Sequence, residues 1–180
     1  YEAQLDRAYQ WTKEKGINHV KTGYAGGIPG GHHRHSHYAV RHYRKVVQEA
    51  AKHKITINAH EPIKDTGIRR TYPNMMSREG ARGMEWNAWS EGNPPEHYEY
   101  LPFTRLLSGP MDYTPGTFDI TLENSKNHPN RKPWNGNDKG NSRVNTTLAK
   151  QMANWVIIYS PVQMASDLVE HYEGHPAFQF

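Results

Sequence analysis

The chain contains no cysteine, so disulfide frameworks and thiolate metal sites are excluded. It also lacks any apolar run of about 18 residues, the minimum for a membrane-spanning helix. We therefore expect no membrane span. Only 35% of the residues are hydrophobic, and the mean hydropathy is −0.95, which is low for a domain that must build its own core. Either the chain is a small marginal domain or it is part of a larger structure.

Recognisable nucleotide, nucleic-acid and zinc motifs are absent as well. The net charge is +4, but the basic residues are scattered and form no Lys/Arg-rich run, so we expect no nucleic-acid partner. GGIPGG (26–31) lacks the Lys-Ser/Thr ending of a phosphate-binding loop. HHRHSH (32–37) fits no recognised zinc spacing, although its histidines could border a ligand pocket.

What is present at the N-terminal side is an alternation of helix and strand patterns. Apolar residues recur at helical spacing over 5–12 and from about 36 to 50. Strand patterns occupy 17–22 and 55–59, where Ile55, Ile57 and Ala59 alternate with polar residues. This βα repetition predicts an α/β fold with a parallel sheet.

The patterns beyond residue 60 are weaker. We predict a long loop at 62–77 and a polar surface loop at about 120–142. Helices are expected at 97–107 and 144–158. Three short strands are expected at 82–86, 111–114 and 162–168. With 180 residues the chain suggests one domain, yet it is shorter than the roughly 250 residues of a complete (β/α)8 barrel. Because it opens in a helical pattern without a start methionine and ends on an apolar Phe178–Phe180, we expect a fragment of a larger barrel.

Three carboxylates, Glu61, Glu79 and Glu85, fall in the most informative stretch, 55–89. Groups at the C-terminal ends of parallel strands converge on one pocket in a barrel, and paired carboxylates are what hydrolysis of a glycosidic bond requires. Glu85 is the first candidate for the general acid, because an apolar setting between Met84 and Trp86 would favour a protonated carboxyl group. A solvated surface carboxylate is the alternative for Glu85, and a salt bridge to a neighbouring arginine is the alternative for Glu79.

Five motifs extend over most of the chain in the same order as in a known family. They are VKTGYAGG (20–27), INAHEPIKDTG (57–67), RRTYPNMMSREGARGMEW (69–86), LPFTRLLSGPMDYTPGTFD (101–119) and YSPVQMASDL (159–168). With these motifs the chain resembles the catalytic module of glycoside hydrolase family 97, whose members include calcium-dependent bacterial α-glucosidases of starch utilisation. The resemblance implies the C-terminal part of a (β/α)8 TIM-type barrel, preceded by an N-terminal domain and the first barrel strands upstream of Tyr1. It also implies an oligosaccharide substrate and a periplasmic or secreted location.

The resemblance assigns roles to individual residues. Glu85 corresponds to the general acid and belongs with Glu61 and Glu79 to the residues expected to hold Ca²⁺, a cation that takes six to eight oxygen ligands. Glu61 corresponds to a residue that also helps to activate water. His60 and Lys21, at the ends of adjacent strands, are expected to contact sugar hydroxyls, although each could equally be structural.

Gly23 is informative because it has no side chain. Retaining members of the family resemble this segment but have an aspartate nucleophile at the position of Gly23, so the pattern resembles the inverting branch, in which a carboxylate activates water. We therefore expect an exo-acting, inverting α-glucosidase for starch-derived oligosaccharides. The alternatives are an α-galactosidase of the same family and a catalytically silent carbohydrate-binding module. The fragment alone could also be inactive.

Overall fold

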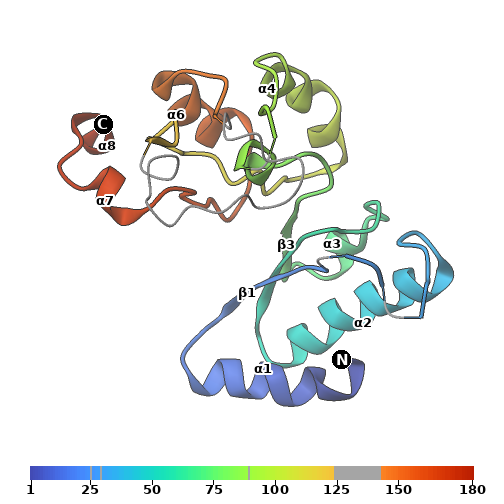
Figure 1. Cartoon of the computed structure of the whole chain (residues 1–180). Helices are drawn as coiled ribbons and strands as arrows, with labels where there is room; N and C mark the ends of the chain where they lie inside the picture. Colours follow the sequence, from blue (N-terminus) through green and yellow to red (C-terminus); the bar gives the residue numbers. More distant parts are fainter. Residues whose placement is uncertain (25, 29, 89, 124–142) are drawn as a thin grey trace. The chain divides into compact units, whose positions relative to one another are not determined.

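The computed structural model describes residues 1–24, 26–28, 30–88, 90–123 and 143–180 (Figure 1). These residues form two compact units, which are described separately. The first consists of residues 1–80, 108–112 and 160–162, and the second of residues 81–107, 113–159 and 163–180. Most of the polar loop predicted at about 120–142 lies outside the described residues.

A three-stranded parallel sheet, in the order β1-β2-β3, organises the first unit. Its strands are β1 (His19–Thr22), β2 (Thr56–Ala59) and β3 (Met75–Arg78). β1 pairs with β2 from His19 opposite Thr56 to Thr22 opposite Ala59. Met111 adds a single parallel bridge beside Arg78, which brings a distant segment of the chain next to β3. The predicted α/β fold with a parallel sheet is confirmed, and the strand predicted at 111–114 is reduced to this bridge.

Two helices of the first unit pack side by side on the sheet: α1 (Leu5–Glu14) and α2 (His37–Lys52) (Figure 1). The shared core is aliphatic apart from one tyrosine and contains Leu5, Tyr9, Val46, Ala50, Ile55, Ile57 and Ala59. Ser36 caps α2, since its Oγ accepts a hydrogen bond from the amide of Ala39 at 3.4 Å. The sequence predicted both helices correctly. The short α3 (Ile68–Thr71) and β3 lie where a loop was predicted at 62–77.

The second unit contains short helices and turns. These are η2 (Met84–Ala88), α4 (His97–Tyr100), η3 (Leu101–Phe103), η4 (Arg105–Ser108, whose last residue lies in the first unit), α6 (Leu148–Ile157), α7 (Val169–Tyr172) and α8 (Pro176–Gln179). The predicted helix at 97–107 is broken into α4 and two 3-10 turns, because Pro102 has no amide hydrogen to continue an α-helix. The predicted helix at 144–158 is present as α6. In the part of the chain that the structure describes, no helix is both long and apolar enough to cross a bilayer.

Two predicted strands were wrong. Residues 82–86 begin a 3-10 turn instead, after Gly80 has left the sheet with a left-handed backbone (φ 70°). Residues 162–168 do not form a ladder, because their amides bond locally or to loops: Val162 N–H donates to Ser160 Oγ at 3.3 Å, and Ser166 N–H donates to the carbonyl of Pro115 at 3.3 Å. Apolar residues at alternate positions were therefore insufficient to define a strand without a partner.

Candidate functional site

The C-terminal edge of the sheet gathers the polar residues that follow its strands. Because the three strands are parallel, Gly23 after β1, His60 and Glu61 after β2, and Glu79 after β3 emerge at the same edge. The amide of His60 donates to the carbonyl of Thr22 at 2.6 Å, which continues the ladder beyond β2. Four of the sequence-predicted site residues, Lys21 among them, thus belong to one region of the first unit.

Asp112 is the centre of this region. Its carboxylate is buried, with 1% of the side chain exposed, and its Oδ2 accepts hydrogen bonds from Asn58 Nδ2 at 2.5 Å and His60 Nε2 at 2.7 Å. Lys21 Nζ lies 3.4 Å from the same oxygen. The amide of Asp112 donates to the carbonyl of Arg78 at 3.1 Å, so backbone pairing beside β3 fixes the carboxylate in place. One buried anion therefore joins the two residues that the sequence predicts to bind sugar.

The protonation state of Asp112 follows from these contacts. Burial alone would raise the pKa of Asp112, but the hydrogen bonds from His60 and Asn58 and the charge of Lys21 bring the pKa below its ordinary value. The carboxylate is therefore ionised at neutral pH and can only accept hydrogen bonds. Nε2 of His60 must then carry the hydrogen that Asp112 accepts, and this hydrogen bond sets the orientation of the imidazole ring.

The other ring nitrogen of His60 faces a second carboxylate. Nδ1 lies 3.5 Å from Glu79 Oε2, so the imidazole ring is held between Glu79 and Asp112. Glu79 is buried, and its amide donates to the carbonyl of Ala59 at 2.9 Å. His60 is therefore one partner of Glu79 at this edge.

Glu61 has an unusual backbone. Its φ is +44°, in the left-handed region that residues with a Cβ rarely adopt, and such conformations concentrate at functional sites. Two contacts hold it there: Oε2 accepts a hydrogen bond from the amide of Tyr24 at 2.6 Å, and the carbonyl oxygen accepts one from the hydroxyl of Tyr43. The carboxylate is consequently directed back across the end of β1.

Gly23 leaves the space that the Glu61 carboxylate uses. A Cβ at Gly23 would lie 2.5 Å from Glu61 Oε2, closer than such atoms approach, and 3.0 Å from the Cβ of His60, a tight contact. Gly23 does not have a positive φ, so close approach rather than backbone conformation is the reason for glycine here. A side chain at position 23 and the present position of Glu61 exclude each other.

Glu61 and Glu79 can share a divalent cation. Each offers a carboxylate oxygen within 4.8 Å of the other's. Oxygens bound to one calcium ion at about 2.3–2.6 Å can be separated by that distance, and carboxylates are the ligands that calcium prefers. The donor set of the first unit therefore fits a hard cation.

Glu85, the predicted acid, is in the second unit. It occupies the first turn of η2, where the amide of Met84 donates to the carbonyl of Tyr113 at 3.0 Å. Met84 is buried, but Glu85 is exposed, and the ring of Trp86 lies under the guanidinium of Arg82 at 4.9 Å. The apolar enclosure predicted from Met84 and Trp86 was therefore wrong for the second unit by itself.

Two residues of this region escaped the sequence analysis. The sequence analysis gave Asp112 no role, and Asn58 was treated as an ordinary polar position of a strand. A signal was available for each: Asp112 is a lone carboxylate in the segment GPMDY (109–113), and Asn58 is a polar residue between Ile57 and Ala59 in β2. Their side chains are 54 positions apart, so their pairing could not be deduced from local pattern.

Comparison with known proteins gave consistent matches to one family. Residues 1–81 match the family model described as Glycoside hydrolase 97. Two curated bacterial relatives are similar. The "Retaining alpha-galactosidase" of Bacteroides thetaiotaomicron is 31% identical over 73% of this chain and 19% of its own length. The "Probable retaining alpha-galactosidase" of Streptomyces bingchenggensis is 29% identical over 76% of this chain and 18% of its own length.

One enzyme of known structure is more similar still. A Glycoside Hydrolase Family 97 enzyme from Pseudoalteromonas sp. strain K8, in complex with acarbose, matches 99% of this chain with a TM-score of 0.83 and 46% identity. A substituted form of that enzyme in complex with panose matches with a TM-score of 0.84 and 45% identity. The chain spans only 27% of these structures and about a fifth of the curated relatives.

Proposed function

The chain belongs to glycoside hydrolase family 97, and from this premise we propose that it is part of the (β/α)8 catalytic domain of an exo-acting, inverting α-glucosidase. The substrate would be a starch-derived oligosaccharide. An enzyme 46% identical to this chain has been solved in complex with acarbose, and a substituted form of it with panose, an oligosaccharide of α-linked glucose. This similarity supports glucose over galactose as the sugar that is released.

The pairing of Gly23 with Glu61 is the observation that carries the inverting mechanism. Inversion needs a carboxylate that activates water, whereas retention needs a nucleophile that attacks the sugar carbon. Position 23 offers no nucleophile, and its missing side chain makes room for the carboxylate of Glu61 at 2.5 Å from where a Cβ would be. Glu61, held by the amide of Tyr24, is thus available to help activate the attacking water, together with a second base carboxylate that the resemblance assigns to an earlier strand.

The other first-unit residues would bind the sugar. His60 and Lys21 both contact the buried carboxylate of Asp112, which limits their freedom before any ligand arrives. Preorganised donors lose less entropy when they bind a hydroxyl group. We propose that His60 and Lys21 contact the hydroxyls of the terminal sugar and that Asp112 positions them.

Glu85 would supply the proton for the departing oxygen. This role comes from the resemblance, since Glu85 falls on the position of the general acid in the family motif. A carboxylic acid in this role acts by proton transfer in the transition state, which contributes typically 10²–10⁴-fold to the rate. No other step is assigned to the second unit.

Calcium is the cofactor we propose. Glu61 and Glu79 would hold it through the oxygens that lie within 4.8 Å of one another, and the resemblance adds Glu85 to the ligands. When bound, Ca²⁺ supplies positive charge that polarises nearby oxygen atoms. By the same resemblance we propose a periplasmic or secreted location and an N-terminal domain in the same polypeptide.

An α-galactosidase is the second candidate, because both curated relatives carry that name. They are described as retaining enzymes, and retention in this family resembles a pattern with an aspartate where this chain has Gly23. The lower identity of these relatives and the absence of a side chain at position 23 favour the glucosidase.

The test is to follow hydrolysis of p-nitrophenyl α-glucoside by proton NMR in the presence of calcium, with p-nitrophenyl α-galactoside in a parallel sample. We expect β-glucose to appear before mutarotation produces the α-anomer, and galactoside to react much more slowly. α-Glucose appearing first would overturn inversion. Oligosaccharide binding by calorimetry without any sugar release would instead support the silent binding module.

A further inference from the structure

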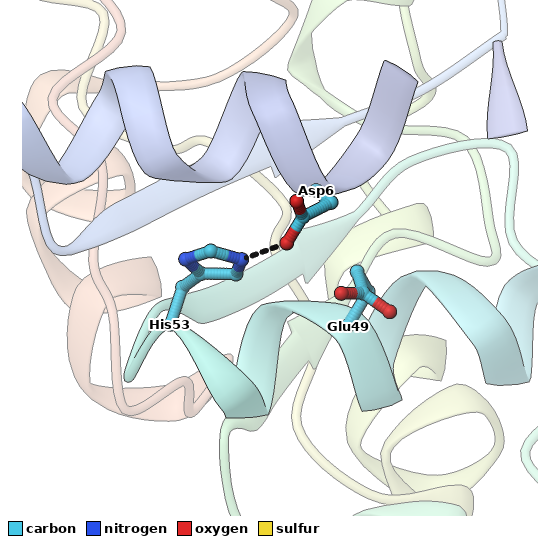
Figure 2. Close-up of side chains that lie close together, drawn as sticks. All are labelled: Asp6, Glu49 and His53. Carbon is cyan, nitrogen blue, oxygen red and sulfur yellow. Dashed lines mark hydrogen bonds and ion pairs between the residues drawn. The ribbon is translucent and has the colours of Figure 1, made fainter. Parts of the chain in front are cut away.

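Three metal-binding side chains meet on the helical layer of the first unit, where α1 and α2 pack together. Asp6 comes from the first turn of α1, and Glu49 and His53 come from the C-terminal end of α2. Figure 2 shows Asp6 pointing toward His53, with Glu49 beside them. One ligand atom from each of the three lies within 4.8 Å of the other two.

The spacing along α2 explains why two of these ligands share a face. Glu49 and His53 are four residues apart, so their side chains lie one above the other on the same side of the helix. Asp6 completes the set from the neighbouring helix, and its Oδ1 lies 2.8 Å from Nε2 of His53. The contact between Asp6 and His53 therefore joins α1 to the end of α2 through two side chains.

The electrostatics of this end of α2 favour a cation. The C-terminus of an α-helix carries a partial negative charge, and Glu49 adds a full negative charge in the last turn, where an anion is disfavoured. Lys52 offsets part of it, since its Nζ donates to Glu49 Oε2 at 2.8 Å, but Lys52 is 68% exposed and can turn away. The side chains of Glu49 and His53 are only 15% and 19% exposed, which gives these two ligands defined positions, whereas Asp6 is 73% exposed and is held by its contact with His53.

We propose that Asp6, Glu49 and His53 form a binding site for a divalent transition metal of the zinc type. An imidazole nitrogen with two carboxylates suits zinc or cobalt, whereas calcium prefers oxygen ligands alone. Ligands of one tetrahedral ion lie roughly 3.4 Å apart, given bonds of about 2.1 Å. Asp6 Oδ1 and His53 Nε2, now 2.8 Å apart, would separate slightly to admit the ion, and Glu49 has an oxygen within 4.8 Å of both. Two carboxylates and a neutral imidazole balance the double charge, and water fills the open position.

The site is separate from the proposed catalytic edge of the sheet. Its ligands come from helices rather than from the strand ends, and its chemistry differs from that of the pair Glu61 and Glu79. The ion would tie α1 to α2 in the folded protein only, so it would raise the thermal unfolding midpoint. This readout does not depend on hydrolytic activity.

The test is a titration of the protein with Co²⁺, followed by its visible absorption bands, in a buffer that holds excess Ca²⁺ to fill oxygen-only sites. We expect one saturable Co²⁺ ion in the wild-type protein, and a higher unfolding midpoint when Zn²⁺ is added. His53→Ala should abolish both effects. The double variant Asp6→Asn/Glu49→Gln, which keeps the imidazole, should weaken binding by at least the about 10–100-fold typical of losing an outer partner of a ligand.

The run of histidines from 32 to 37 is the obvious competitor and supplies the control. His33→Ala/His35→Ala removes two imidazoles whose ring centroids lie 5.6 Å apart, and it should leave the Co²⁺ signal intact. Circular dichroism without metal checks that each variant is folded; if His53→Ala is not, the double variant decides. Unchanged binding in the folded variants, loss of binding in the control, or no Co²⁺ bound by the wild type would each overturn the proposal.

Discussion

In the first unit a group of buried polar side chains at the carboxyl edge of the parallel sheet contact one another, whereas in the second unit the buried side chains of Asn87 and Asn93 lie among turns and mainly contact the backbone. Asn58, His60 and Asp112 illustrate the first arrangement, with one carboxylate oxygen accepting from two side chains. The parallel ladder already satisfies the backbone around them. Their remaining hydrogen-bonding capacity is available to a ligand.

The second unit has no sheet among its described residues. There, buried side-chain amides form hydrogen bonds with backbone groups that a sheet would otherwise pair. Asn87 Nδ2 donates to the carbonyl of Met84 at 2.9 Å, and Oδ1 of Asn87 accepts from the amide of Asn93 at 2.8 Å. Asn93 Nδ2 in turn donates to the carbonyl of Gly83 at 3.1 Å. The comparison teaches that a buried polar side chain is a candidate for a functional role where it is not required to satisfy backbone hydrogen-bonding groups.

Glu85→Gln has the largest expected effect and tests whether the second unit contributes chemistry as well as scaffolding. The amide cannot donate a proton to the leaving oxygen, so kcat on oligosaccharide should fall about 10²–10⁴-fold. The loss should be much smaller with p-nitrophenyl α-glucoside, whose leaving group needs no protonation. Equal losses on both substrates, measured by steady-state kinetics, would contradict the acid role.

Gly23→Ala probes the edge of the first unit. The new Cβ would overlap the carboxylate of Glu61, which must move aside, and a displacement of about 1 Å can lower activity about 10²-fold. We expect kcat/KM to fall to this extent with little change in the unfolding midpoint. Gly27→Ala is the matched control, because a Cβ there meets no atom within 4 Å. If both variants behave alike, crowding of Glu61 is not the cause.

Asp112→Asn should affect stability and sugar binding together. The variant keeps the shape but loses the charge that His60 and Lys21 contact, and we expect a loss of about 1–3 kcal/mol in the free energy of unfolding at pH 7 together with a raised KM. Chemical denaturation and steady-state kinetics measure the two effects. A stability loss with unchanged KM would reduce Asp112 to a structural residue.

The same variant has a defined pH dependence. Because the pKa of Asp112 is lowered by folding, its ionised form stabilises the native state fully above the ordinary aspartate pKa of about 3.9. This stabilisation is lost as the pH falls through the lower, folded-state value. The difference between wild type and Asp112→Asn should therefore shrink below about pH 4, as measured by denaturation at a series of pH values. A difference independent of pH would show that charge is not its origin.

Asn93→Ala is the counterpart in the second unit. It removes the bonds of Nδ2 to the carbonyl of Gly83 and to the hydroxyl of Tyr113 at 3.0 Å, both in buried surroundings. We expect a loss of about 1–3 kcal/mol in stability, since buried partners are left unsatisfied, with kcat and KM of the folded protein retained. A changed KM at unchanged stability would break the comparison between the two units.

The helix caps have the smallest expected effects and offer one change in each unit. Ser36 caps α2, and Thr147 caps α6 by accepting from the amide of Lys150 at 3.2 Å. Each change to alanine should lower the free energy of unfolding by about 0.5–1 kcal/mol, the low end for a cap, because both bonds are long. Thermal unfolding of the two variants checks this, and a much larger loss in one unit would indicate that its helix is poorly supported by packing.

The sequence predicted those parts of the fold that local pattern determines. The alternation at 55–59 and the helical spacing over 36–50 correspond to β2 and α2. β3 was missed because Met75–Arg78 contains no β-branched residue; pairing with β2 makes it a strand. The strands expected at 82–86 and 162–168 failed for the opposite reason, since no partner pairs with them among the described residues.

The candidate site was predictable only in part. Lys21, His60 and Glu61 could be placed at strand ends because a parallel sheet brings such ends together, whereas Glu79 was assigned only through the resemblance. Asp112 could not be placed, because its contact with Asn58 joins segments 54 residues apart and depends on the Met111 bridge beside Arg78. Long-range packing of this kind leaves no periodic trace in the sequence.

The crowding at Gly23 also constrains how this sequence can change over generations. A side chain gained at position 23 while Glu61 is present forces the two groups together, so that single step is penalised whatever benefit the new group could bring later. The carboxylate at 61 must then turn aside or be lost. The two positions are therefore expected to drift as a pair, and each is a poor guide to ancestry when read without the other.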